Sequence, residues 1–167
     1  MTALYKFQKV LFVLTINLFP FLFFGQDCLS SENADSLLAF SKKFLGTPYR
    51  YASMNPQKGF DCSGFTSYVF NHFGYKVPRS SLEYEKFGKS INKDSAKAGD
   101  IIVFRGTNAK NKRPGHVGIV IERTENDLVF IHSSSNKKRG GVIISTFNQS
   151  PYYLKRFIRI CRITNCN

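Results

Sequence analysis

The organising segment of this chain reads Gly59-Phe60-Asp61-Cys62-Ser63-Gly64-Phe65-Thr66-Ser67-Tyr68-Val69-Phe70. Within and just beyond it, Phe65, Val69 and Phe73 recur every four residues, which places them on one face of an α-helix. The segment therefore predicts a helix that follows directly on a glycine-containing loop, with a cysteine at the junction.

The cysteine at this junction is a candidate nucleophile. Asp61 stands at the N-cap position and Gly74 stands where a glycine commonly follows the last turn, so Cys62 falls in the first turn. Unpaired backbone N–H groups and the positive end of the helix dipole favour a thiolate over a thiol there. The alternative is a buried cysteine that packs as a small apolar group.

The N-terminus has the pattern of a secretory signal peptide over residues 1–25. A weakly basic start precedes an almost wholly apolar run from Val10 to Phe24, and we expect cleavage between Gly25 and Gln26. An uncleaved membrane anchor is the alternative, but the run is shorter than the roughly 20 apolar residues that span a bilayer. We therefore expect an exported protein, either periplasmic, in the cell envelope or secreted, which meets the membrane only through its export signal.

The rest of the chain is strongly basic. All 11 acidic residues and 22 of the 24 basic residues follow residue 25, which gives that part a net charge of +11. Such a charge favours an anionic partner, whether nucleic acid, an acidic membrane or an acidic cell-wall polymer. No nucleic-acid-binding motif is present, and an exported chain meets the wall or the membrane surface first. The pattern indicates no cofactor and leaves the oligomeric state open.

The chain has four cysteines, Cys28, Cys62, Cys161 and Cys166. If Cys62 stays free, at most one disulfide forms among the others, and a bridge from Cys28 to Cys161 or Cys166 would tie the two ends together. The spacing does not decide this connectivity. No CxxC and no spacing typical of a structural zinc site occurs, so no metal is predicted.

The order of the predicted elements indicates an α+β domain over residues 34–163, between a short segment at 26–33 and a tail at 164–167. Helical patterns come first and strand patterns follow, which favours N-terminal helices packed on an antiparallel sheet. Besides the cysteine-bearing helix, we expect helices at 33–45 and 82–87 and strands at 100–104, 117–121, 128–131, 142–146 and 157–163.

Two of the three histidines fall on neighbouring predicted strands. A hairpin centred on Thr124 places His116 directly opposite His132 on one sheet face, and a slip of one residue would separate them. Gly118 shares the face of His116 and leaves room for another element, such as the start of the cysteine-bearing helix. The third histidine, His72, lies near the end of that helix and is expected to be structural or exposed.

Together these residues indicate a cysteine nucleophile system. Cys62 would attack, His116 would take and return the proton, and His132 would orient His116 through its other ring nitrogen. A neutral histidine can accept that hydrogen bond. The alternatives are two unrelated surface histidines, or a Cys/His/His zinc site, which the ligand spacing does not favour.

The ordered motifs of the chain resemble those of the NlpC/P60 cysteine peptidases. They are Gly46-Thr47-Pro48-Tyr49-Arg50-Tyr51, Phe60-Asp61-Cys62-Ser63-Gly64-Phe65, Val77-Pro78-Arg79-Ser80-Ser81, Gly99-Asp100-Ile101-Ile102-Val103-Phe104 and Gly115-His116-Val117-Gly118-Ile119-Val120. The resemblance spans residues 34–163. It implies a papain-like α+β hydrolase that cuts peptidoglycan stem peptides, usually at the γ-D-glutamyl–diaminopimelate bond, with Cys62, His116 and His132 as nucleophile, base and third polar member.

The same resemblance implies substrate contacts. Tyr49 would line the site near the sulfur, and Asp61 and Ser63 would help to hold the free amino end of the substrate. The chain departs from the family at two places, because Ala52-Ser53 stands where paired glycines are common and Tyr84 stands where a glutamine is common.

The leading hypothesis is an exported cysteine endopeptidase that acts on peptidoglycan peptides through an acyl-enzyme on Cys62. An amidase or acyltransferase on the same fold would use the same thiolate. A non-catalytic basic domain that binds the cell wall or nucleic acid is the third hypothesis, supported by the charge of the chain and by its Phe and Tyr content, although most of those aromatic residues follow core-periodic positions.

Overall fold

The computed structural model describes residues 29–108, 110–138 and 140–164. The predicted signal peptide lies outside this part of the chain, as do Cys28, Cys166 and most of the predicted tail. Within the described residues, no helix has both the length and the apolar character needed to cross a membrane.

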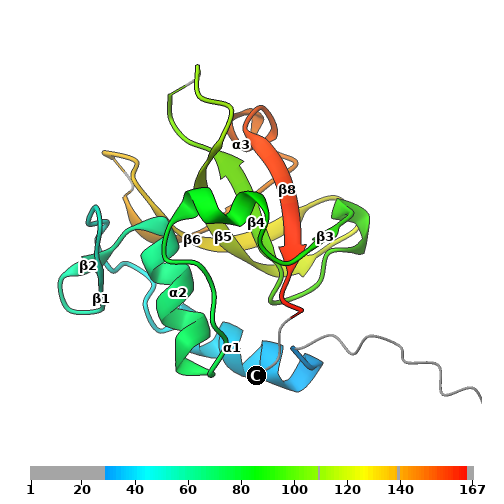
Figure 1. The fold of residues 1–167 in the computed structure, drawn as a ribbon, viewed down its shortest axis with the longest axis horizontal. Coiled ribbons are helices and arrows are strands. Elements are labelled where there is room, and N and C mark those ends of the chain that lie inside the picture. The colour runs from blue at the N-terminus through cyan, green and yellow to red at the C-terminus, as the bar shows by residue number, and fades with distance from the viewer. Residues whose placement is uncertain (1–28, 109, 139, 165–167) are drawn as a thin grey trace, which may run out of the picture.

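The fold is a six-stranded antiparallel sheet with helices α1 and α2 packed together on one side (Figure 1). The strand order is β3-β8-β4-β5-β6-β7, and a small hairpin of β1 and β2 stands apart from the sheet. The helices are α1 (Ser31–Lys42), α2 (Cys62–His72) and α3 (Pro151–Leu154), and the 3-10 turns are η1 (Ser81–Glu85) and η2 (Lys93–Ser95). The strands are β1 (Met54–Asn55), β2 (Gly59–Phe60), β3 (Lys89–Ile91), β4 (Ile101–Arg105), β5 (Pro114–Arg123), β6 (Leu128–Ser134), β7 (Gly141–Thr146) and β8 (Phe157–Arg162). The predicted α+β class, with N-terminal helices on an antiparallel sheet, is confirmed.

One apolar cluster fills the space between the two helices and the sheet. Leu37 of α1 and Phe65 and Val69 of α2 are fully buried in it, together with Val117 of β5 and Ile131 of β6. Burying side chains of this size stabilises the fold by roughly 1.5–3 kcal/mol each. The cluster therefore fixes α2 against β5 and β6, and with it the start of the helix.

The other face of the sheet buries a second cluster, to which β4, β5, β6 and β8 contribute Ile102, Phe104, Val120, Phe130 and Ile160. Tyr153 of α3 packs on this face, with its ring centroid 5.1 Å from that of Phe104 and 5.0 Å from that of Phe130. The sheet is thus apolar on both faces, and α3 lies on the side opposite α1 and α2.

The ends of α2 are set by local signals, as predicted. Asp61 accepts a hydrogen bond from the Gly64 N–H at 2.6 Å and so caps the helix, and Gly74 has a φ of +80° after the last turn. Helix α1 begins and ends slightly earlier than the predicted range 33–45. Its start is set by Ser30, whose side chain accepts a hydrogen bond from the N–H three residues further on.

Several short elements were not predicted. Strands β1, β2 and β3 and helix α3 have four residues or fewer, and the helix predicted at 82–87 is the 3-10 turn η1. Ala52, where the family often has glycine, has a φ of +54° and is the one non-glycine residue with positive φ in the described part of the chain. Tyr84, the second departure, is fully buried and donates its hydroxyl to the Pro78 carbonyl at 3.0 Å.

Cys161 in β8 is a free thiol. It is fully buried among the apolar side chains that face the helices, and this burial raises its pKa to about 12. The free thiol contradicts the disulfide between Cys28 and Cys161, one of the two bridges that we considered. The other, between Cys28 and Cys166, lies outside the described residues.

Candidate active site

Cys62 is the first residue of α2 and is 7% exposed. Its sulfur lies 4.0 Å from the carbonyl oxygen of Gly115, and the backbone N–H of Val117 is also directed at it. These two residues flank His116, so the packing of α2 on β5 brings the predicted nucleophile against the backbone on both sides of the predicted base. Gly115 allows the start of β5 to approach Gly106 closely, because a Cβ at Gly115 would lie 2.5 Å from the Cα of Gly106.

The β5–β6 hairpin sets His132 beside His116, but in a different register from the predicted one. Ile119 pairs with Ile131, which puts His132 opposite Gly118 instead of opposite His116. The predicted register is therefore wrong. The shift is an even number of residues, so both imidazoles stay on one face, as predicted. His116 Nε2 lies 2.9 Å from His132 Nδ1.

The turn of the hairpin explains the different register. The Thr124 N–H donates to the Asp127 carbonyl at 2.8 Å, and Thr124 Oγ1 accepts from the Asp127 N–H at 2.9 Å. These bonds place the turn between the two residues, whereas we predicted it to be centred on Thr124. The strands realign through a bulge between Val120 and Glu122.

Gly118 makes room for the second histidine. A Cβ at Gly118 would lie 3.1 Å from the His132 Cβ and 2.8 Å from Phe130 Cδ2. The space that we assigned to the start of the cysteine-bearing helix is therefore occupied by side chains of β6. Helix α2 instead reaches the site from the other face of the sheet, at the end of β5 where His116 stands.

His132 is held from its other side by two residues that the sequence patterns did not indicate. His132 Nε2 lies 3.0 Å from Ser145 Oγ in β7 and 3.1 Å from the Tyr153 hydroxyl in α3. If Nε2–H donates to this pair, Nδ1 is left as an acceptor for Nε2–H of His116. That tautomer leaves Nδ1 of His116 free to take a proton, so the chain of contacts orients both rings.

Burial governs the protonation of the two imidazoles. It lowers the pKa of His116 to about 4, with a smaller contribution from the positive charge of Arg156. It also lowers the pKa of His132 well below its usual range, and His116 adds to that effect. Both rings are therefore neutral near pH 7, as the hydrogen-bond arrangement requires.

Burial also raises the pKa of the Cys62 thiol, the opposite of the direction that we predicted from its position. The backbone N–H groups of Val117, Ser63 and Cys62 itself do lower this pKa, but the effect of burial is larger and the nearby Asp61 adds to it. The resting site therefore holds a neutral thiol and neutral imidazoles, so a nucleophilic role for the sulfur would require transfer of its proton.

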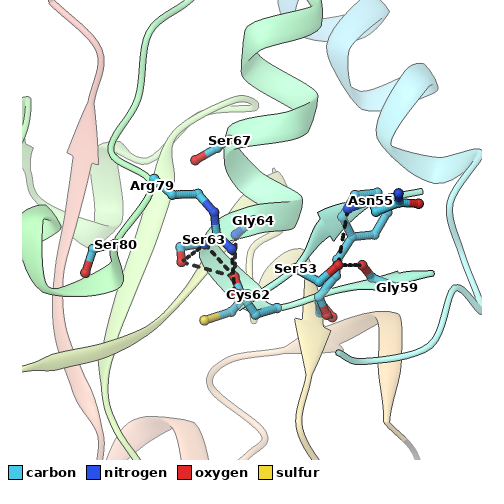
Figure 2. A network of polar contacts seen from close by, with 12 residues as sticks. Ser53, Asn55, Gly59, Cys62, Ser63, Gly64, Ser67, Arg79 and Ser80 are labelled. Atoms are coloured by element: carbon cyan, nitrogen blue, oxygen red, sulfur yellow. Dashed lines mark hydrogen bonds and ion pairs between the residues drawn. The ribbon is translucent and has the colours of Figure 1, made fainter. Parts of the chain in front are cut away.

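Asp61 and Ser63, the predicted substrate contacts, form a network with Arg79. Arg79 donates to both carboxylate oxygens of Asp61, at 3.0 and 2.8 Å, and to Ser63 Oγ at 3.2 Å. Figure 2 shows Arg79 and Ser63 meeting at the start of α2, with the Cys62 sulfur pointing away from them. The Asp61 carboxylate is thus already paired by the protein, and the role of both residues in holding substrate stays a prediction.

Cys62 and His116 open onto a cleft of about 780 Å³. Tyr49 lines this cleft, whereas Asp61 and Ser63 do not. Burial raises the pKa of Tyr49 to about 12, with contributions from Cys62 and Asp61, so its hydroxyl remains a hydrogen-bond donor at neutral pH. In residues 29–108, 110–138 and 140–164, no group of three or more His, Cys, Asp or Glu side chains is placed to hold a metal ion, and the zinc alternative gains no support.

Comparison with known proteins identifies the family. The profile described as NlpC/P60 family matches residues 46–162 of this chain. The chain belongs to the NlpC/P60 family. The resemblance seen in the sequence motifs is therefore confirmed, and with it the papain-like fold that the resemblance implied.

The chain is similar to proteins named as hydrolases and endopeptidases. It is 29% identical over 165 residues to Gamma-DL-glutamyl hydrolase of Bacillus subtilis (strain 168), which covers 98% of this chain and 38% of that protein. It is 36% identical over 119 residues to Murein DD-endopeptidase MepS/Murein LD-carboxypeptidase of Escherichia coli (strain K12), which covers 71% of this chain and 56% of that protein. The crystal structure of an NlpC/P60 family protein from Bacillus cereus ATCC 10987 superimposes with a TM-score of 0.67 and 30% identity, covering 79% of this chain and 40% of that one. This chain thus spans less than two thirds of each of the three, and their names support the predicted enzyme class.

Proposed function

We propose that this protein is an exported cysteine endopeptidase that hydrolyses peptidoglycan stem peptides. The observation that carries the proposal is the arrangement of Cys62 and His116 at one cleft, with the buried His132 in contact with His116. The sulfur contacts the backbone on both sides of His116, and His116 Nε2 lies 2.9 Å from His132 Nδ1. The signal-peptide pattern of residues 1–25 supports export, and the relative named as a murein endopeptidase supports peptidoglycan as substrate.

The first step is attack by Cys62 on the carbonyl carbon of the scissile amide. As the S–C bond forms, the thiol proton passes to Nδ1 of His116. His132 keeps the His116 ring in place and accepts its Nε2–H, so the imidazolium that forms has a partner on that side. In the resting site, burial disfavours transfer of the thiol proton to His116. The negative charge that develops on the carbonyl oxygen during attack favours that transfer.

The carbonyl oxygen that becomes negative is expected to lie at the start of α2. The backbone N–H groups of Cys62 and Ser63 are near the sulfur, and the protonated Tyr49 hydroxyl lines the same cleft. Fixed donors in a site with little water stabilise such an oxyanion more than water does.

The intermediate then collapses in two stages. The C–N bond breaks, His116 gives its proton to the departing amine, and the acyl group stays on Cys62 as a thioester. Water attacks the thioester carbon while His116 takes one of its protons. As the C–S bond breaks, His116 returns this proton to the sulfur, and the carboxylic acid that forms loses its proton to the released amine or to solvent. Each cycle thus consumes one water and restores Cys62 and His116 to their neutral forms.

We further propose the γ-D-glutamyl–diaminopimelate bond as the bond that is cut. The motif pattern supports it, as does the similarity over 98% of this chain to a protein named as a γ-DL-glutamyl hydrolase. The relative named as a murein DD-endopeptidase makes the D,D cross-link bond the competing candidate.

Digestion of defined muropeptides, followed by mass spectrometry, tests the proposal. The wild-type protein should release fragments with a new γ-glutamyl carboxylate, and Cys62→Ala should reduce this to background. Cys161→Ala, which removes a buried thiol outside the cleft, is the matched control and should retain the activity. Release by Cys62→Ala as fast as by wild type would overturn the proposal, a new amide or ester would indicate a transferase, and separation of peptide from glycan would indicate an amidase.

A further inference from the structure

Arg156, between α3 and β8, gives the cleft a cationic wall. It lines the cleft together with Cys62 and His116, and it is the one charged side chain among the described lining residues. A smaller hollow of about 260 Å³, also lined by Arg105 and Lys155, adjoins it. Within residues 29–108, 110–138 and 140–164, no Asp or Glu side chain forms an ion pair with Arg156.

The protein holds the Arg156 guanidinium in one orientation. Nε and Nη2 donate to the Arg105 carbonyl at 3.2 and 2.6 Å, and Nη1 donates to the Tyr152 hydroxyl. The Tyr152 ring supports it from one side, with its centroid 4.5 Å from the guanidinium carbon. A guanidinium fixed in this way loses little conformational entropy when it binds a ligand.

The guanidinium keeps free donors in this position. It has five N–H groups, and the three bonds use one on Nε, one on Nη1 and one on Nη2. One N–H therefore remains on each terminal nitrogen. Two such donors match the two oxygens of a carboxylate, and charge-assisted bonds of this kind are about twice as strong as neutral ones.

The location of Arg156 indicates which part of a substrate would reach it. Asp61, which is expected to help hold the free amino end of the substrate, follows directly on β2 of the β1–β2 hairpin, and Tyr49 pairs with Phe60 of the same hairpin. Figure 1 shows this hairpin and α3 well apart, and both Tyr49 and Arg156 line the cleft that holds Cys62. A peptide with its amino end on the hairpin side of Cys62 therefore directs its leaving group toward Arg156.

We propose that Arg156 binds a free carboxylate on the leaving-group side of the scissile bond, namely the carboxylate next to the departing amine. This inference rests on the proposed peptidase function. A leaving amino acid carries its carboxylate on the same carbon as its amine, so the ligand group lies within a few bonds of the reacting atoms. A carboxamide at that place has no charge and one oxygen, so it loses most of the interaction.

A pair of substrates tests the inference. One is the L-alanyl-γ-D-glutamyl-diaminopimelate tripeptide. The other is the same tripeptide in which one carboxyl group of diaminopimelate, the one on the carbon that bears the scissile amide nitrogen, is converted to a carboxamide. Wild type should prefer the free carboxylate by roughly ten- to a hundred-fold in kcat/KM. Arg156→Gln should lose this preference by slowing only the carboxylate substrate, and Arg156→Lys, which keeps the charge without the fork, should restore part of it.

Lys155→Gln is the matched control, because it removes a neighbouring positive charge that lies outside the main cleft. It should keep the preference. Equal rates of wild type on the two substrates, or an equal loss on both in Arg156→Gln, would overturn the inference. Calorimetric binding of both tripeptides to Cys62→Ala separates the two proposals. If Cys62→Ala binds the carboxylate tripeptide more tightly but wild type hydrolyses neither tripeptide, the Arg156 site stands and the peptidase function is rejected. If wild type hydrolyses both tripeptides equally well and Cys62→Ala binds them equally, the peptidase function stands and the Arg156 site is rejected.

Discussion

Replacing His116 with glutamine should remove a large part of the sensitivity of this fold to acid. The pKa of His116 is about 4 in the folded protein, against an ordinary value of 6.5. Between these values the unfolded chain binds a proton that the folded protein does not, so the free energy of unfolding falls as the pH falls. The contribution of His116 is complete above pH 6.5 and is lost as the pH approaches 4.

The size of this effect follows from the two pKa values. Each unit of difference between the two pKa values corresponds to about 1.4 kcal/mol, so the full loss is about 3.5 kcal/mol, of which about 2 kcal/mol is lost by pH 5. His132 adds to the loss in the same direction, since burial lowers its pKa as well. For a domain of this size, such a change is a large fraction of the total stability.

Urea unfolding at constant ionic strength between pH 8 and pH 4.5 measures this dependence. The free energy of unfolding of wild type should fall by at least about 2 kcal/mol between pH 8 and pH 5. For His116→Gln, the fall over the same interval should be smaller than that of wild type by about 2 kcal/mol. His72→Gln, which removes an exposed histidine at the end of α2, is the control and should keep the loss that His116 causes. Parallel curves for wild type and His116→Gln would refute the conclusion that His116 is held neutral by burial.

Three other perturbations test neighbouring parts of the site. Because burial raises the pKa of Cys62, its alkylation by iodoacetamide should speed up about tenfold per pH unit between pH 6.5 and 8.5; a plateau at neutral pH would instead reveal a resting thiolate–imidazolium pair. Ser145→Ala and Tyr153→Phe each leave His132 one partner, so the double variant should lose more activity and stability than the sum of the single variants, by about 1–3 kcal/mol in unfolding free energy; additive losses would show that the two contacts act independently. Ala52→Gly should stabilise the protein by about 1 kcal/mol in thermal unfolding, because Ala52 has a φ of +54°, and a lower Tm would contradict that estimate.

The features that could be predicted from sequence are those set by neighbouring residues. Asp61 and Gly74 mark the ends of α2 through local hydrogen bonds and local backbone conformation, so a single segment was enough to place Cys62 at the start of the helix. His116 and His132 could be placed on one face because strand side chains alternate, and this holds for any even shift of register.

The predictions that were wrong or missing concern features that depend on tertiary structure or on turn chemistry. The hairpin register is set by the bonds between Thr124 and Asp127, which the loop length alone does not reveal. The pKa of Cys62 depends on how deeply α2 packs against β5, and burial there outweighs the helix N-terminus. Ser145 and Tyr153 contact His132 only because β7 pairs with β6 and α3 packs on the face of the sheet that carries His132, so no sequence motif marks them.

The central claim is that Cys62 carries the acyl group during peptide hydrolysis. Rapid quenching of the reaction with a γ-D-glutamyl tripeptide, followed by intact-protein and peptide mass spectrometry, tests it most directly. We expect a transient mass increase equal to the acyl fragment, on the peptide that contains Cys62, and neither the adduct nor the products in Cys62→Ala. An adduct on a different residue, or undiminished hydrolysis by Cys62→Ala, would contradict the account.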